Sequence, residues 1–190
     1  MLFRSRTVGL SADLFKQMGA AVTIMGGGEI VPAMDRGLLD AAEFNNPSSD
    51  KLLGFPDVSK EYMLQSYHQS AECFEVMFSK TKFDALAPEL QAIIKYAAES
   101  SSTDMSWKAM DRYSADLEAI KAAGVNVQRT PDSVLQAQLA AWDQVLAVQS
   151  ADPFFAKVIE SQKAWVKRVV GAEFELEVDQ KMAFEHFFKA

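Results

Sequence analysis

The chain has 190 residues, of which 49% are hydrophobic and 24% are charged, and its formal net charge is −7. This composition excludes a disordered tail, a collagen and a disulfide scaffold, and the length is sufficient to bury a sizeable core. The single cysteine, Cys73, excludes an internal disulfide and a cysteine-based zinc cluster. The acidic excess argues against binding to a phosphate backbone, so no nucleic-acid partner is expected. No apolar run approaches the ~20 residues of a membrane-spanning helix.

The first part of the chain alternates strand-like and helix-like segments. Hydrophobic periodicity, with glycines at the boundaries, predicts three short strands with a helix between each pair. The strands are expected at Leu2–Val8, Ala21–Met25 and Leu38–Phe44, and the helices at Ser11–Met18, with Ser11 as the N-cap, and at Glu29–Arg36. A β-α-β-α-β order of this kind predicts a parallel sheet covered by helices.

The rest of the chain is predicted to be mostly helical. Residues 45–60 combine asparagine, serine, proline and glycine, and are expected to form loops and turns. Residues 61–68 and 73–79 are rich in β-prone side chains and are expected to be strands. The later elements are a helix over Pro88–Ala123 that is long enough to join two bodies, a strand over Val125–Val127, and helices that begin at Thr130 and at Asp152, the second of which ends at Gly171.

The Gly26-Gly27-Gly28 sequence is followed by Glu29 and is open to two interpretations. A phosphate-binding loop would surround the anion with backbone N–H groups, but the Lys-Ser/Thr pair of such loops is absent and Glu29 would repel the phosphate. A plain turn from strand to helix is therefore favoured.

His68 has two carboxylates close to it in sequence, Glu72 and Glu75. Such a pair is suited to general acid–base catalysis by a small hydrolase or lyase. No Gly-x-Ser-x-Gly motif accompanies it, so structural roles are favoured and the chain is not expected to be an enzyme.

Two predicted strands end in candidate binding residues. Arg6 lies at the edge where a parallel sheet presents ligands, and its planar guanidinium suits a carboxylate. The segment Glu43-Phe44-Asn45-Asn46-Pro47 combines a carboxylate, an aromatic ring and two amides, a set that suits a pocket or a cation. The alternatives are a surface role for Arg6 and a solvated turn for the Glu43–Pro47 segment.

Four segments together resemble the DctP-type solute receptors of TRAP (tripartite ATP-independent periplasmic) transporters. The most specific is GGEIVPAMDRGLLDAAE, residues 27–43, which is similar to the family's signature of a glutamate, a hydrophobic run, a glycine and an Asp-Ala pair. The others are RSRTV at residues 4–8, YHQ at residues 67–69, and the long helix followed by AGVNV at residues 123–127. The Glu43-Phe44 pair is similar to the subgroup that binds 2-oxo acids and other monocarboxylates.

The resemblance implies an α/β fold, a lobe of the type II periplasmic binding proteins with a helical C-terminal half. Receptors of this family carry a signal peptide and a first lobe ahead of the strand that contains Arg6, so the chain is expected to be a C-terminal portion with the first lobe largely missing. The implied parts are a second-lobe segment (1–57), returning strands of the first lobe (58–87), a long interlobe helix (88–124), a second-lobe strand and helices (125–171) and a C-terminal helix (172–190).

The resemblance also implies roles for individual residues. Arg6 would pair with the ligand carboxylate, and Asn45 is expected to line the same site because of its place directly after the Glu43-Phe44 pair. Glu43, Phe44 and Gln69 would hold a sodium or calcium ion that bridges to the ligand. The family usually has glutamate where Gln69 stands and tryptophan where Phe44 stands.

The implied function is the solute-binding subunit of a TRAP transporter, which captures a 2-oxo or 2-hydroxy monocarboxylate in the periplasm. Its partners would be the organic acid, the membrane permease subunits and a second copy bound through the C-terminal helix. Packing of that helix on its own chain remains the alternative. A different class, a helical protein-interaction module without a small-molecule ligand, would use the aromatic-rich C-terminal half.

Overall fold

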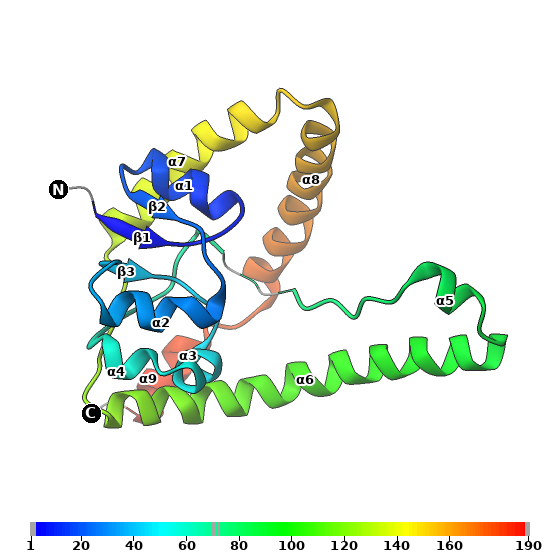
Figure 1. Ribbon diagram of the computed structural model, residues 1–190, viewed down its shortest axis with the longest axis horizontal. Helices are drawn as coiled ribbons and strands as arrows, with labels where there is room; N and C mark the ends of the chain where they lie inside the picture. Colours follow the sequence, from blue (N-terminus) through cyan, green and yellow to red (C-terminus); the bar gives the residue numbers. More distant parts are fainter. Residues whose placement is uncertain (1–2, 70, 72, 189–190) are drawn as a thin grey trace. The chain divides into compact units, whose positions relative to one another are not determined.

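The computed structural model describes residues 3–69, 71 and 73–188 (Figure 1). The chain divides into two compact units, Met1–Trp142 and Asp143–Ala190. Among the described residues, no helix is both long enough and apolar enough to cross a membrane.

The first unit begins with a three-stranded parallel sheet, as the alternation of segments predicts. Strand β1 (Arg4–Arg6) lies in the centre and pairs with β2 (Ala21–Thr23) and with β3 (Ala41–Ala42). The strands are shorter than expected: β2 covers three residues of the predicted Ala21–Met25 strand, and β3 covers only two of the predicted Leu38–Phe44 strand. Because β1 and β3 are parallel, their C-terminal ends lie at one edge of the sheet. Arg6, the last residue of β1, and Glu43, the residue after β3, meet there.

Two helices connect these strands, α1 (Leu10–Gln17) and α2 (Gly27–Asp35). The prediction that Ser11 caps α1 is wrong: the N-cap is Gly9, whose φ of 59° favours glycine. Ser11 lies inside the helix and donates its hydroxyl to the carbonyl of His68. Ile30 and Ala33 of α2 form a buried core with Leu39, and Phe44 and Phe55 pack against it.

Residues 45–60 are not loop throughout, contrary to the expectation. They contain α3 (Pro47–Leu53) and α4 (Phe55–Val58). Asn46 caps α3 by accepting from the Ser49 N–H at 2.9 Å, and Pro47 occupies the first helical position. Gly54, with a φ of 87°, separates the two helices. The residues that suggested turns are therefore helix-boundary residues.

A second, two-stranded parallel sheet pairs β4 (Glu61–Leu64) with β5 (Asn126–Arg129). β4 is shorter than the predicted strand over residues 61–68, because Gln65 adopts a φ of 72° and turns the chain. The predicted strand over residues 73–79 is wrong. These residues have no regular structure and are exposed, and no described strand pairs with them. β-propensity depends on such a partner.

The long predicted helix is confirmed as α6 (Pro88–Ala122), which follows the short α5 (Lys80–Asp84). α6 packs against α3, and the two run side by side in Figure 1. Asp116 of α6 accepts hydrogen bonds from Ser48 at 2.6 Å and from Lys51 at 2.8 Å. α6 is thus fastened to the segment that follows β3.

The last helices are α7 (Asp132–Gln149), α8 (Pro153–Leu176) and α9 (Gln180–Phe188). Asp152 caps α8, as predicted, by accepting from the Phe155 N–H at 2.7 Å. Gly171 does not end α8, contrary to the prediction. A glycine inside a helix costs only about 1 kcal/mol relative to alanine, which its neighbours can offset.

Candidate functional site

Arg6 is almost completely buried, with 5% of its surface exposed, so the surface interpretation is wrong. Its Nε and Nη2 donate to the carbonyl of Met25 at 3.1 and 3.0 Å. Its Nη1 donates to the carbonyl and to the carboxylate Oε1 of Glu43, at 2.9 and 3.1 Å. These four hydrogen bonds fix the guanidinium at the end of β1. They leave the fifth N–H, on Nη2, for another acceptor.

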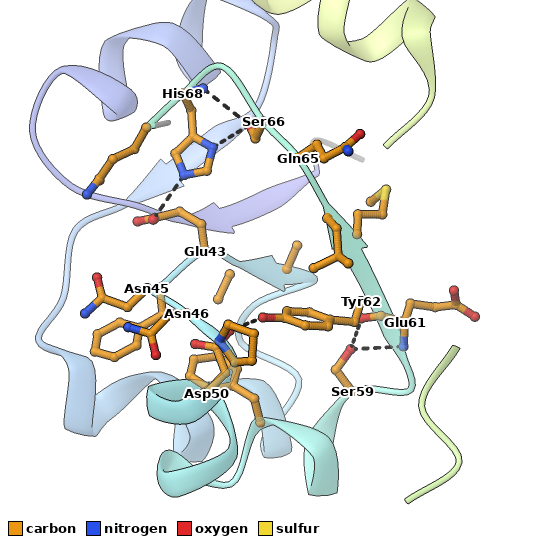
Figure 2. A pocket seen from close by; sticks show the side chains of 18 of the residues that line it. Glu43, Asn45, Asn46, Asp50, Ser59, Glu61, Tyr62, Gln65, Ser66 and His68 are labelled. Carbon is orange, nitrogen blue, oxygen red and sulfur yellow. Dashed lines mark hydrogen bonds and ion pairs between the residues drawn. The ribbon is translucent and has the colours of Figure 1, made fainter. Parts of the chain in front are cut away.

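Glu43 joins Arg6 to His68. Its Oε1 accepts from Arg6, and its Oε2 lies 3.3 Å from Nε2 of His68 (Figure 2). The Glu43 and His68 side chains are 12% and 15% exposed. The proposed catalytic pairing of His68 with Glu75 is not formed, since His68 contacts Glu43 instead, and Glu72 lies outside the described residues.

The segment that carries His68 is fastened to α7. Gln138 accepts from the Tyr67 N–H and donates to Ser66 Oγ, both at 2.8 Å. Trp142 donates from Nε1 to the Tyr67 carbonyl at 2.7 Å. The aromatic ring of Phe15 in α1 lies 5.5 Å from the His68 ring, measured between centroids. His68 is therefore held from both sides by helices of the first unit.

Phe44 supplies an aromatic wall beside Arg6. The Arg6 guanidinium carbon lies 5.7 Å from the centre of its ring, within the range of a cation–π interaction, and the ring stacks on Phe55. The ring also reaches α2, where a Cβ on Gly27 would come within 2.8 Å of it. Glycine at this position therefore permits the close contact.

The structure favours the plain-turn interpretation of the Gly26–Gly28 sequence. The Glu29 carboxylate accepts from the Gly26 N–H at 3.0 Å and so occupies the start of α2, where a phosphate would bind.

A cavity of about 940 Å³ lies in the first unit, between the segment after β3 and the segment that continues from β4. Glu43, Phe44, Asn45 and Gln69 line it, so the structure brings four of the five predicted site residues together. Arg6 does not line the cavity, but it is hydrogen-bonded to Glu43, which does. Asn45 and Gln69 are exposed.

Several lining residues were missed by the sequence analysis. Tyr62 donates to Asp50 at 2.7 Å across the cavity wall, and Asp50 is buried (Figure 2). Asp40 also lines the cavity. Hydrogen bonds from the Arg4 side chain and from its backbone N–H lower the pKa of Asp40 to about 2. Alternation within β4 could have indicated Tyr62, since Tyr62 and Leu64 are less exposed than Glu61 and Met63.

The described residues contain no group of three or more His, Cys, Asp or Glu side chains suited to a metal ion. A site built from the Glu43 carboxylate, the Phe44 carbonyl and the Gln69 amide would consist of oxygen donors alone. Oxygen is the ligand that sodium and calcium prefer, so these residue types fit such an ion.

The model of the family described as DctP, bacterial extracellular solute-binding protein, family 7, matches residues 1–152. A monocarboxylate 2-oxoacid-binding periplasmic protein of Nostoc sp. is 28% identical over 171 residues, which are 87% of this chain and 46% of the relative.

Two solved structures extend this likeness. A TRAP periplasmic solute-binding protein of Pseudoalteromonas atlantica, with bound sodium and pyruvate, is 25% identical with a TM-score of 0.77, and the match covers 93% of this chain and 56% of that one. One from Sulfitobacter sp., with bound β-D-galacturonate, is 25% identical with a TM-score of 0.67, covering 84% and 52%. The expected fold class is thus confirmed. The chain spans about half the length of the relatives it matches.

Proposed function

The chain belongs to the bacterial extracellular solute-binding proteins of family 7 (DctP), and from that premise we propose that it forms the ligand-binding part of a TRAP receptor for a small organic acid. The observation that carries the proposal is the buried Arg6, which keeps one N–H available beside a cavity lined by Glu43 and Phe44. A guanidinium recognises a carboxylate by charge and by hydrogen bonding together.

The ligand class we propose is a 2-oxo or 2-hydroxy monocarboxylate. Support comes from the Nostoc relative, named for 2-oxoacids, and from the pyruvate bound to the Pseudoalteromonas neighbour. In this chain, Arg6 would donate to the ligand carboxylate, and Asn45 would offer its amide from the cavity wall. Phe44 would cover the apolar side of the ligand and exclude water from the pair.

Glu43, Phe44 and Gln69 would hold a sodium or calcium ion, which would supply positive charge beside the ligand carboxylate. The sodium in the Pseudoalteromonas neighbour supports this proposal. Gln69 contributes a neutral amide oxygen, so this set carries one negative charge, on Glu43. We therefore expect a monovalent or weakly bound ion.

The receptor would work in the periplasm and deliver its ligand to membrane permease subunits. We also propose a homodimer through α9, whose apolar side chains Met182, Phe184, Phe187 and Phe188 are 63–74% exposed. Sedimentation velocity tests this: Phe187→Ser should abolish a dimer, whereas Phe174→Ser, at a position of α8 that is 85% exposed, should leave it intact.

A thermal melt of the 190-residue chain tests the ligand proposal. The panel is pyruvate, a longer 2-oxo acid, lactate and galacturonate, each with sodium, with calcium and with a chelator. A ligand that binds only the native state raises the Tm by mass action. A rise with the 2-oxo acids supports the proposal, while a rise with galacturonate alone would overturn the proposed ligand class.

A further inference from the structure

Ser66 Oγ forms hydrogen bonds with three nitrogen atoms. Gln138 Nε2 lies 2.8 Å away and the backbone N of His68 lies 3.3 Å away, and both carry hydrogen and donate. The third is His68 Nδ1, with which Ser66 Oγ also forms a hydrogen bond. A hydroxyl oxygen has two acceptor lone pairs and one O–H donor. The two N–H donors fill the lone pairs, so the Ser66 O–H must donate to Nδ1.

The orientation of the Gln138 amide is itself determined. Its oxygen accepts from the Tyr67 backbone N–H, which is a donor under all conditions. Its nitrogen must then face Ser66. Gln138 is 3% exposed, so water does not compete for these bonds. The direction of the hydrogen bonds from Gln138 to Ser66 and from Ser66 to His68 follows from this one amide.

An imidazole that accepts at Nδ1 carries its proton on Nε2 when it is neutral. Nε2 is the atom that faces Glu43 Oε2 at 3.3 Å. Neutral His68 is thus a hydrogen-bond donor to the Glu43 carboxylate. The same bonds argue against Ser66 as a nucleophile, because both of its lone pairs are engaged.

We propose that Gln138, Ser66 and His68 are positioning residues that fix the His68 tautomer and thereby hold the Glu43 carboxylate between His68 and Arg6. This rests on the proposed function in one respect, namely that Glu43 and Arg6 serve ligand binding. With Glu43 held, both N–H groups of Arg6 Nη1 are occupied, and one N–H of Nη2 remains for one oxygen of a ligand carboxylate.

The tautomer is measured by ¹⁵N NMR of the imidazole nitrogens in the ligand-free 190-residue chain at alkaline pH. The only other histidine is His186, so His186→Gln assigns the signals. We expect the Nε2–H form of His68 in the unmodified chain and in Ser66→Thr, which keeps the hydroxyl. We expect a mixture of tautomers in Ser66→Ala and in Gln138→Leu. An Nδ1–H form in the unmodified chain, or no change of tautomer in Ser66→Ala, overturns the proposal that Gln138 and Ser66 fix the His68 tautomer.

Pyruvate affinity, measured by calorimetry on the same variants, tests the positioning role. Loss of one hydrogen bond should weaken binding about tenfold in Ser66→Ala, and Ser66→Thr should restore it. An altered tautomer with unchanged affinity overturns the positioning role. Absence of organic-acid binding by the unmodified chain, with the Nε2–H tautomer present, would instead overturn the proposed function and leave the tautomer assignment standing.

Discussion

The Arg6 guanidinium and the Glu43 carboxylate lie 3.1 Å apart, and only 6% and 12% of these side chains are exposed. Glu43 reaches Arg6 because β3 is hydrogen-bonded directly to β1, so the ends of both strands fall at one edge of the sheet. A pair that is shielded from water has a large effect on stability when one partner is removed, because the other charge is left buried.

Replacement of Arg6 by methionine should lower the free energy of unfolding by about 3–5 kcal/mol, since Glu43 would keep its charge in a buried position. It should also abolish binding of pyruvate. The matched control is Arg4→Met in the same strand, where the ion pair with Asp40 is about one-third exposed and the loss of stability should be smaller than for Arg6→Met. Urea denaturation and calorimetry measure the two effects. Equal stability of the two variants would contradict the structural role of Arg6.

Alanine at Gly27 should destabilise the chain by about 1–3 kcal/mol, because its Cβ would overlap the Phe44 ring. Gly28 lies next to it in α2, and a Cβ added there would have nothing within 4 Å. Gly28→Ala should therefore stabilise the helix by about 0.5–1 kcal/mol. Urea denaturation compares the variants. Two similar values would show that the Phe44 ring moves aside without cost.

Stability should depend on the ionisation of Asp40. Arg4 lowers its pKa from 3.8 to about 2, so the folded state favours the charged carboxylate. The resulting stabilisation is present above about pH 4 and is lost as the pH falls toward 2. Asp40→Asn should therefore be less stable than the unmodified chain at pH 6, and the difference should shrink between pH 4 and pH 2.

The control for Asp40 is Asp132→Asn, at a side chain that is 77% exposed and 3.4 Å from Arg129. It should change stability little at any pH. A difference between Asp40→Asn and the unmodified chain that persists at pH 2 would mean that the charge of Asp40 is not its cause.

Asp116→Asn should loosen α3 from α6, because Ser48 and Lys51 both donate to this carboxylate. These bonds also lower the pKa of Asp116, with Lys51 as the largest cause. Hydrogen exchange of the α3 amides should become faster. Asp104→Asn removes a comparable lysine contact from the exposed part of α6 and should leave α3 unchanged. Unaltered exchange in Asp116→Asn would show that apolar packing alone fastens α3.

The sequence was informative where the relevant signal is local or repeats along the chain. Arg6 and Glu43 lie near the ends of segments with strand periodicity, so their meeting at one sheet edge could be expected from the order of elements. The α3 helix was missed although Asn46-Pro47 is an N-cap followed by an N1 proline. Asparagine, serine and proline occur in turns and at helix starts alike, so these residue types alone do not distinguish the two.

Other features depend on partners far away in sequence and could not be derived locally. His68 lies 25 residues from Glu43, and Gln138 lies 72 residues from Ser66. Neither pairing produces a repeating pattern in the sequence that could predict it. Residues 73–79 carry β-prone side chains, but strand formation requires a neighbouring strand, which single-sequence patterns do not reveal.

The pairing of β4 with β5 has a consequence for the order of folding. Glu61 pairs with Asn126, which lies 65 positions later, and the pairing is parallel, so no hairpin can nucleate it. During synthesis, β4 leaves the ribosome well before its partner exists, whereas α6 can form locally in the meantime. Assembly of the cavity wall from Tyr62 to His68 must therefore wait for β5 and be a late event.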